Sequence, residues 1–485
     1  MRSLARFVER MSIMLNAVNH FFTTFGASVI VPVMIFLVAG LLGVKLKVAL
    51  QSALAVGVGL TGFGWLISAF TPAVTKLIKQ MVQTTGIHLP IVDLGWQTGS
   101  LAAFGSTVGL TFFIGGLLLE LALFALKITR VFMPSNLWNN FGFMIWATMA
   151  YTVTHNLGLA LGLATFLLLV TLLLAEIQAD AWSTFYGIKN ATVAAPHNIE
   201  QVVPILLLDP LWNLLGFNRV HVTLARFKAR FGLLGEPTAL GALLGLLIGI
   251  LGNLTRLTSL SAWGQIAQFT IQLAAIMTIF PLVTQVFAGA FAPLAAAIDQ
   301  RHQTSDQAST DLTDPKRWFL AIDDGVGYGE TTTLMAGMLL IPLMVGVAFL
   351  LPGNRALPVV DLIALPFMIE SIVALTRGNL LKILATGVVW FSLGLYAASW
   401  LGDVYTAAVA QYGTALPTGV VLITSFNLIA RPLNALIFAA FISQNPVWIG
   451  LCLLLYLIGL VALRTRRPQI WAYLRKMAAQ NEPAK

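Results

Sequence analysis

Two short segments of the chain carry side chains that could bind a hydroxylated solute, and both lie between long apolar runs. The first, Phe185–Asn213, places His197 and Asn198 directly after Pro196. Imidazole and carboxamide groups both donate and accept hydrogen bonds, as hydroxyl groups do. The segment contains three prolines, which interrupt helices, so we predict a re-entrant hairpin at 185–213. The alternative is that the two polar residues cap a short re-entrant helix.

The second segment, Gln411–Asn434, resembles the first. Both segments contain a Tyr-Gly pair near the start, and both end with a Pro-Leu pair followed by Asn. We therefore predict a second re-entrant hairpin at 402–434. Two irregular segments at corresponding places in two halves of a membrane chain are typical of a transporter's binding site.

Two further pairs of side chains have types and spacings suited to polyol recognition. Asp93 and Trp96 lie in the sequence IVDLGWQTG. A carboxylate accepts hydrogen bonds from hydroxyl groups, and an indole packs against the C–H face of a polyol. Tyr151 and His155 are four residues apart, which places them on one face of a helix. The alternatives are a capping aspartate in an ordinary turn and a buried histidine bonded to a neighbouring carbonyl group.

A glycine-rich acidic turn forms a third candidate. Asp323 and Asp324 precede Gly325, Gly327 and Gly329. Such a turn could bind a cation or a hydroxylated ligand, or it could be a solvated loop. It is no phosphate-binding loop, because no Gly-Lys-Ser/Thr follows and carboxylates repel phosphate.

The composition sets the class of protein that must position these residues. Of 485 residues, 58% are hydrophobic and 10% are charged, and the mean hydropathy is +0.86. A soluble protein of this length needs a more charged surface, so we predict an all-α polytopic membrane protein. The net charge of +9 comes from basic residues in short loops, where it orients the chain in the membrane.

Other chemistries find no support in the sequence. The one cysteine, Cys452, lies in an apolar run and is expected to be a packing residue, so it forms neither a disulfide nor a cysteine metal site. The chain shows no H-E-x-x-H motif and no Walker motif. We therefore expect neither a cofactor nor a metal, and we exclude an ATP-driven pump acting alone.

The apolar runs predict about eleven membrane-spanning helices. They lie at roughly residues 25–44, 49–70, 104–127, 141–156, 158–178, 236–255, 264–290, 331–351, 361–376, 381–400 and 436–463. The C-terminal residues after 463 are rich in arginine and are expected on the cytoplasmic side.

Several motifs recur in the same order in the two halves. Asn156-Leu157 matches Asn379-Leu380, and Asp93-Leu-Gly95 matches Asp323-Asp-Gly325. If each copy holds five spans, an odd number, the copies cross the membrane in opposite directions and form an inverted repeat. The predicted organisation is an amphipathic lead-in (1–24), a first repeat (25–218), a basic cytoplasmic loop (219–235), a second repeat (236–434), a last transmembrane helix (435–463) and a basic cytoplasmic tail (464–485).

The order of these motifs resembles the galactitol-type membrane subunit, enzyme IIC, of the bacterial phosphotransferase system. The resemblance extends from about Phe25 to Arg467. It rests on VDLGW (92–96), Trp138-Asn139, Pro196-His197, FGLLGEP (231–237), Pro352-Gly-Asn354 and Arg377-Gly-Asn379-Leu380.

The resemblance implies a carrier in the bacterial cytoplasmic membrane that takes up a sugar or sugar alcohol while the solute is phosphorylated. The phosphoryl donor would be a phosphocysteine on a separate IIB protein, which is charged by IIA. Related ascorbate carriers imply a V-motif domain, a core domain and a homodimer. The residues implied to face the ligand are Asp93, Trp96, Tyr151, His155, His197, Asn198 and Asp323.

A basic loop offers a docking surface for an acidic, phosphorylated partner such as IIB. Its basic residues are Arg219, Arg226, Lys228 and Arg230. The chain departs from the galactitol pattern at Glu330, where that family has a histidine, so the identity of the solute stays open. Two other functions are an ion-coupled secondary transporter that uses the aspartates, and a channel or scaffold without solute turnover.

Overall fold

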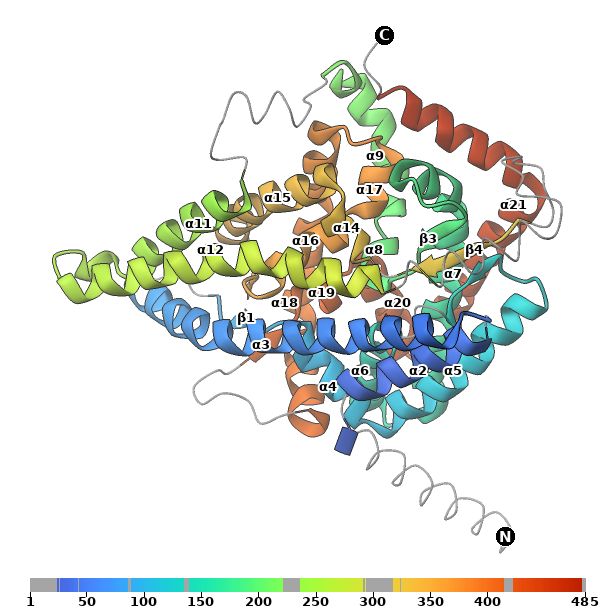
Figure 1. Cartoon of the computed structure of the whole chain (residues 1–485), viewed down its shortest axis with the longest axis horizontal. Coiled ribbons are helices and arrows are strands. Elements are labelled where there is room, and N and C mark those ends of the chain that lie inside the picture. Colours follow the sequence, from blue (N-terminus) through green and yellow to red (C-terminus); the bar gives the residue numbers. More distant parts are fainter. Residues whose placement is uncertain are drawn as a thin grey trace, which may run out of the picture.

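The computed structural model describes residues 24–25, 27–41, 43–85, 89–134, 139–220, 236–290, 293, 317–322, 324–413 and 422–481. Figure 1 shows that this part of the chain is mostly helical. Within it, five helices are long and apolar enough to cross a membrane: α5 (Thr107–Ala125), α7 (Leu157–Tyr186), α15 (Thr331–Leu350), α18 (Leu380–Tyr412) and α21 (Pro446–Ala479). The predicted class, a helical membrane protein, is confirmed, whereas the number of eleven spans stays a prediction.

Four further helices pack together at one side of the molecule. They are α2 (Ala27–Leu41), α3 (Leu46–Thr85), α11 (Pro237–Gly252) and α12 (Leu260–Gly289), and a short 3-10 turn, η4 (Leu254–Arg256), joins the last two. In Figure 1, α3 and α12 run along the long axis of the molecule. The hairpin of α11 and α12 is tight, because a Cβ on Gly245 would lie 2.6 Å from the Cα of Thr270. Small residues allow such close packing of helices in a membrane protein.

Two small parallel sheets lie between the helices, and each draws strands from both halves of the chain. In the first, β1 (Ile91–Asp93) lies between β5 (Ala356–Leu357) and β6 (Leu422–Thr424). In the second, β4 (Phe319–Ile322) lies between β2 (Val131–Phe132) and β3 (Ala191–Val193). The central strand of each sheet therefore comes from one half and the two outer strands come from the other.

Short helices follow the carboxyl ends of these strands. They are α4 (Trp96–Gly105), α8 (Pro196–Ile199), α9 (Val202–Leu214), α14 (Val326–Gly329), α19 (Phe426–Ile429) and α20 (Pro432–Ile442). Three pairs of these helices begin 230 residues apart, namely at Trp96 and Val326, at Pro196 and Phe426, and at Val202 and Pro432. The order of elements thus recurs, and α8 and α19 lie within the two predicted hairpins.

The two halves also start their longest inner helices in the same way. The side chain of Asn156 caps α7 by accepting a hydrogen bond from the Leu159 N–H, and the side chain of Asn379 caps α18 through the Lys382 N–H. The elements before these caps differ. In the first half α6 (Phe141–Thr154) is continuous, whereas the second half has η5 (Asp361–Ala364), α16 (Leu365–Met368) and α17 (Glu370–Leu375). Residues 361–376, predicted as one span, therefore form three short helices.

The last helix, α21, has two parts with different surroundings. In its most apolar window only 6% of the residues are buried, as expected for a helix that faces lipid. The backbone leaves helical geometry at Arg466, and the helix then continues to Ala479 with Trp471 buried against Phe319 of β4. The predicted cytoplasmic tail is thus a docked helix as far as residue 479.

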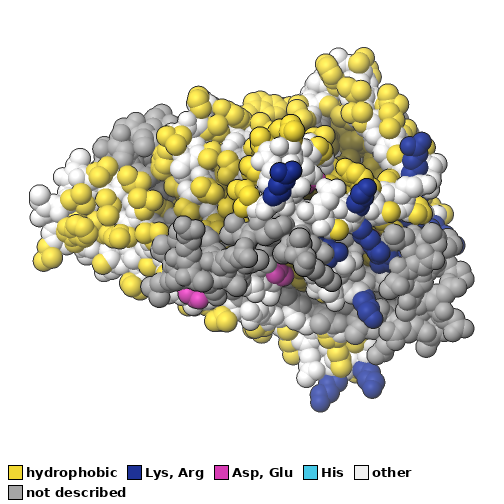
Figure 2. All heavy atoms as spheres, turned by 90° about the horizontal axis from the view of Figure 1, so that it is seen from above, with side chains coloured by type: hydrophobic (Ala, Val, Ile, Leu, Met, Phe, Trp, Pro, Cys, Tyr) yellow, Lys and Arg dark blue, Asp and Glu magenta, His cyan; other side chains and the backbone are white. Residues whose placement is uncertain are grey.

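Hydrophobic side chains cover the end of the molecule formed by α11 and α12, whereas lysine and arginine gather on the other half (Figure 2).

Candidate functional site

The carboxyl edge of the first sheet is held together by the carboxylate of Asp93. Its Oδ1 accepts hydrogen bonds from the N–H groups of Gly95 (3.0 Å) and Phe426 (3.3 Å), and its Oδ2 accepts from Val359 (3.0 Å) and Asp361 (2.7 Å). The Asp93 side chain is fully buried. It therefore joins β1 to the segments that follow β5 and β6.

A second buried carboxylate, that of Asp361, accepts hydrogen bonds at the same edge of the first sheet. Its Oδ1 accepts from the Trp96 N–H at 2.8 Å, and its Oδ2 accepts from the Ser425 hydroxyl at 2.5 Å and the Asn427 N–H at 2.9 Å. The Trp96 ring packs against Phe141 with ring centroids 5.4 Å apart. Asp93 and Asp361 together fix α19, the tip of the second hairpin segment, onto the sheet.

These contacts lead to a first prediction, for Asp93→Asn. The amide nitrogen of asparagine cannot accept a hydrogen bond, so buried N–H groups would lose their acceptor at about 1–3 kcal/mol each. We expect a clear fall in the thermal unfolding midpoint of the purified protein in detergent. Asp403→Asn, at an exposed aspartate of α18, is the matched control and should leave the midpoint unchanged. An unchanged midpoint with weakened solute binding would instead favour direct contact between Asp93 and the solute.

The carboxyl edge of the second sheet carries the predicted histidine. His197, in α8, bonds through Nε2 to Oδ2 of Asp324, the second residue after β4. Both side chains are buried. His197 Nδ1 has no partner among the described residues. Asp323, one of the residues that the family resemblance implied to face the ligand, lies outside the described residues.

Asn198 lies beside His197 but faces a different neighbour. Its Nδ2 donates to the Phe367 carbonyl at 2.6 Å, and its Oδ1 accepts from the N–H (3.2 Å) and the hydroxyl (2.9 Å) of Ser371. The side chain therefore holds α8 against α16 and α17. Its predicted role as a ligand of the solute stays a prediction.

The short helices α8 and α19, which lie in the two predicted hairpins, meet at Arg431, a residue that sequence reasoning missed. Its guanidinium group donates to the carbonyl groups of His197 (2.5 Å) and Phe426 (3.3 Å), and it lies 3.7 Å from the carboxylate of Glu200. The side chain is almost fully buried and sits over the ring of Phe391. The available signal was an arginine inside an otherwise apolar segment, which is costly unless the arginine is paired.

Two carboxylates bond to the glycine-rich acidic turn and to the helix that follows it. Glu370 accepts from the Gly327 N–H at 2.8 Å and from the Trp182 indole at 3.2 Å. Glu330 caps α15 through the N–H groups of Thr332 and Thr333. Among the described residues no group of three or more histidine, cysteine or acidic side chains could hold a metal ion.

Several buried polar atoms near the second sheet lack partners in the described part of the chain. They include both carboxylate oxygens of Glu120 and the amide groups of Asn140 and Gln201. Asn140 neighbours Glu120 and lies directly before α6. The start of α6 is packed against the first hairpin tip, because a Cβ on Gly142 would lie 2.9 Å from the ring of Pro196. Buried polar atoms that remain unpaired cost about 1–3 kcal/mol each, so these atoms suit a polar ligand.

Tyr151 and His155 lie at the other end of α6. Their rings are 6.2 Å apart, and His155 is exposed where it ends the helix with a φ of 50°. Because α6 has 14 residues, this end is about 20 Å from the start of α6. The structure therefore does not bring this pair to the hairpin tips, and its role stays a prediction.

The predicted docking loop is described only at its start. Arg219 ends the 3-10 turn η2 (Phe217–Arg219). Arg226, Lys228 and Arg230 lie outside the described residues, so the docking surface stays a prediction.

Apolar helices combined with interrupted segments that carry buried polar residues are typical of membrane carriers. The family model EIIC-GAT, described as the PTS system sugar-specific permease component, matches residues 20–419. The chain belongs to this family, and the resemblance found in its motifs is confirmed.

Curated relatives agree with the family. The galactitol-specific EIIC component of the PTS system from Escherichia coli K12 is 25% identical over 435 residues, which is 89% of this chain and 92% of that protein. The protein of the same name from Escherichia coli O157:H7 gives the same values. A putative permease IIC component of Escherichia coli K12 is 24% identical over 389 residues, 80% of this chain and 86% of that protein.

Proposed function

We propose that this sugar permease component carries a galactitol-like sugar alcohol across the bacterial cytoplasmic membrane, coupled to phosphorylation of the solute by a IIB partner. The family description and the names of two relatives support this substrate class. The phosphoryl donor must come from a partner, because the single cysteine, Cys452, lies on the apolar part of α21. The partner is IIB, charged in turn by IIA, and the carrier works as a homodimer.

The solute binds at the carboxyl edge of the second sheet, beside the first hairpin tip. The observation that carries this assignment is the set of unpaired buried polar atoms there: His197 Nδ1 and the polar groups of Glu120, Asn140 and Gln201. Each hydroxyl of a polyol both donates and accepts hydrogen bonds, so a polyol can pair with carboxylate, amide and imidazole groups at once. At the first sheet the oxygens of Asp93 and Asp361 already accept from the protein, and the unpaired buried atoms are the single oxygens Thr424 Oγ1 and Asn427 Oδ1.

His197 has the geometry of a general base for the transfer. If its Nε2 carries the proton and donates to Asp324, its Nδ1 is free to accept a proton from a solute hydroxyl. The hydroxyl oxygen then forms a bond to phosphorus while the bond between phosphorus and the cysteine sulfur of IIB breaks. The proton stays on His197 Nδ1, and the cysteine leaves as a thiolate.

The two halves of the chain form an inverted repeat that supports alternating access. The exchange of strands between the two sheets and the 230-residue offset of three helix pairs support this proposal. The proposed repeats are 25–218 and 236–434, with hairpins at 185–213 and 402–434. The tips of the two hairpins face each other through Arg431, as expected for a site at the interface of two repeats.

The test is uptake by vesicles that contain the purified protein, measured with radiolabelled galactitol and a panel of pentitols and hexitols. We expect phosphorylated solute inside the vesicles when phosphorylated IIB is present, and no uptake when IIB is omitted. Vesicles without the protein serve as the control. Free solute that accumulates against an ion gradient in the absence of IIB would instead identify an ion-coupled transporter.

A further inference from the structure

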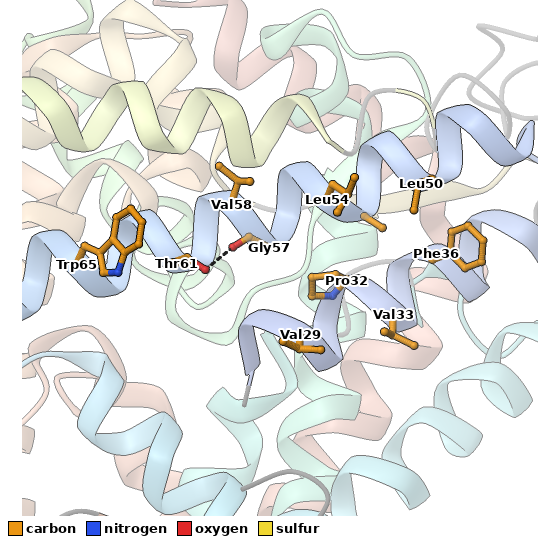
Figure 3. Close-up of a pocket in the computed structure, with 11 residues that line it drawn as sticks. Val29, Pro32, Val33, Phe36, Leu50, Leu54, Gly57, Val58, Thr61 and Trp65 are labelled. Atoms are coloured by element: carbon orange, nitrogen blue, oxygen red, sulfur yellow. Dashed lines mark hydrogen bonds between the residues drawn. The ribbon is translucent and has the colours of Figure 1, made fainter. Parts of the chain in front are cut away.

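An apolar groove runs between α2 and α3 (Figure 3). Its volume is about 600 Å³, and it is lined by side chains from Val29 to Phe36 on α2 and from Leu50 to Trp65 on α3. Thr61 is the one lining residue with a hydroxyl group, and that group donates to the Gly57 carbonyl of its own helix at 2.8 Å. The other lining side chain able to form a hydrogen bond is the indole of Trp65, at the end of the groove far from Leu50 (Figure 3).

The α3 wall of the groove has a basic end. Leu50, Leu54, Val58 and Trp65 recur at spacings of four and seven residues, so they lie along one face of the helix. Lys47 lies three residues before Leu50 on that face, and it is exposed, as is Lys45 in the turn between α2 and α3. From Leu50 to Trp65 the groove is about 22 Å long.

We propose that this groove binds one acyl chain of an anionic phospholipid, with the lipid phosphate held by Lys45 and Lys47. An acyl chain matches an elongated groove whose lining side chains are apolar except for Thr61 and the indole N–H of Trp65. The lysines supply the complementary charge at the end where the headgroup would lie, and each basic residue near an anionic headgroup favours binding. With eleven predicted spans and a cytoplasmic C-terminal tail, counting back along the chain places this turn on the cytoplasmic side as well, where anionic lipid gathers. The proposal is independent of the solute and of the phosphoryl donor.

The test uses the full chain with Cys452→Ala and a single new cysteine labelled with bimane. Val58→Cys places the label in the groove. Leu454→Cys on α21 is the matched control, because the two native side chains are similarly exposed, at 61% and 54%. The proteins are reconstituted in phosphatidylcholine vesicles that contain a minor fraction of phosphatidylglycerol with brominated acyl chains, and fluorescence quenching is measured.

We expect stronger quenching at position 58 than at position 454. Neutralising Lys45 and Lys47 to glutamine should weaken the association of phosphatidylglycerol at position 58 by about fivefold for each lysine. Lys127→Gln, at an exposed lysine after α5, should change nothing. Equal quenching at both positions, or quenching that ignores the lysine substitutions, would overturn the proposal in favour of ordinary surrounding lipid. Weak quenching at position 58 with cross-linking between two chains there would overturn it in favour of a second copy.

Discussion

Replacing His197 by alanine is expected to abolish phosphorylation-coupled uptake while the protein stays folded. Removing a general base typically slows a proton-transfer step by about 10²–10⁴-fold. The chain should still fold, with lower stability because the buried Asp324 carboxylate loses its bond to the imidazole, since the contact of this residue with Arg431 uses the main-chain carbonyl, which alanine retains. The measurement is phosphorylated solute formed in vesicles with IIA and IIB, normalised to the amount of monodisperse protein.

One variant separates the chemistry at His197 from its packing, and a second variant is a control at another histidine. His197→Gln can still bond to Asp324, but it has no basic nitrogen, so it should be as inactive as the alanine variant. His155→Ala removes an exposed histidine about 20 Å from the start of α6 and should keep most of the activity. Uptake at the wild-type rate in His197→Ala would remove this residue from the site.

The class of protein and the positions of the interrupted segments could be predicted from the sequence, because they depend on local properties. Apolar runs identify membrane helices by length, and prolines mark the places where helices break. The short helices α8 and α19 lie within the two interrupted segments identified from the sequence, whereas the hairpins themselves stay a prediction. The recurrence of motifs likewise indicated two related halves, since matching residues begin matching helices.

The contacts of individual polar side chains could not be predicted in the same way. A carboxylate in an apolar segment indicates a ligand site or a buried structural bond, and only the fold distinguishes them. Asp93 bonds to N–H groups of Val359 and Phe426, which are 266 and 333 residues away. No local spacing in the sequence signals such partners.

Charges at the membrane boundary were hard to place for a similar reason. Counting spans back from the cytoplasmic tail places Lys382 at a cytoplasmic end of its helix, yet its side chain is fully buried and bonds to Asp209 at 2.5 Å and Asn213 at 2.6 Å. A basic residue before an apolar run suits both a loop and a buried pair, and the acidic partner lies 173 residues away. The positive-inside rule counts such residues without knowing whether they are paired.

The basic C-terminal residues show the same ambiguity. Arg467 and Arg475 bond to Glu176 and Asp180, two buried acids one turn apart on α7. The carboxylates explain why this part of α21 docks against the protein. The sequence shows the positive charge of the tail directly, whereas the acids that bind it lie inside an apolar helix far away in the chain.

Arg431→Met is expected to have the second large effect, because it breaks a buried ion pair and the bridge between the hairpin tips together. Removing one partner of a buried pair leaves the other charge uncompensated, which costs about 3–5 kcal/mol. Here Glu200 would keep its bond to the Trp390 indole but lose its cation. We expect a large fall in the thermal unfolding midpoint and the loss of coupled uptake.

The double variant Arg431→Met/Glu200→Gln separates these two effects. Glutamine is neutral and can still accept from Trp390, so most of the stability should return. Uptake should stay lost, because the carbonyl groups of His197 and Phe426 no longer accept hydrogen bonds from one guanidinium group. This shared donor sets the position of the first predicted hairpin tip relative to the second. Lys382→Met, which breaks a comparable buried pair between α9 and α18, should lower stability but retain uptake per folded molecule. If the double variant transported solute at the wild-type rate, Arg431 would serve only to neutralise Glu200, and the tips would not need a bridge to hold His197 in place.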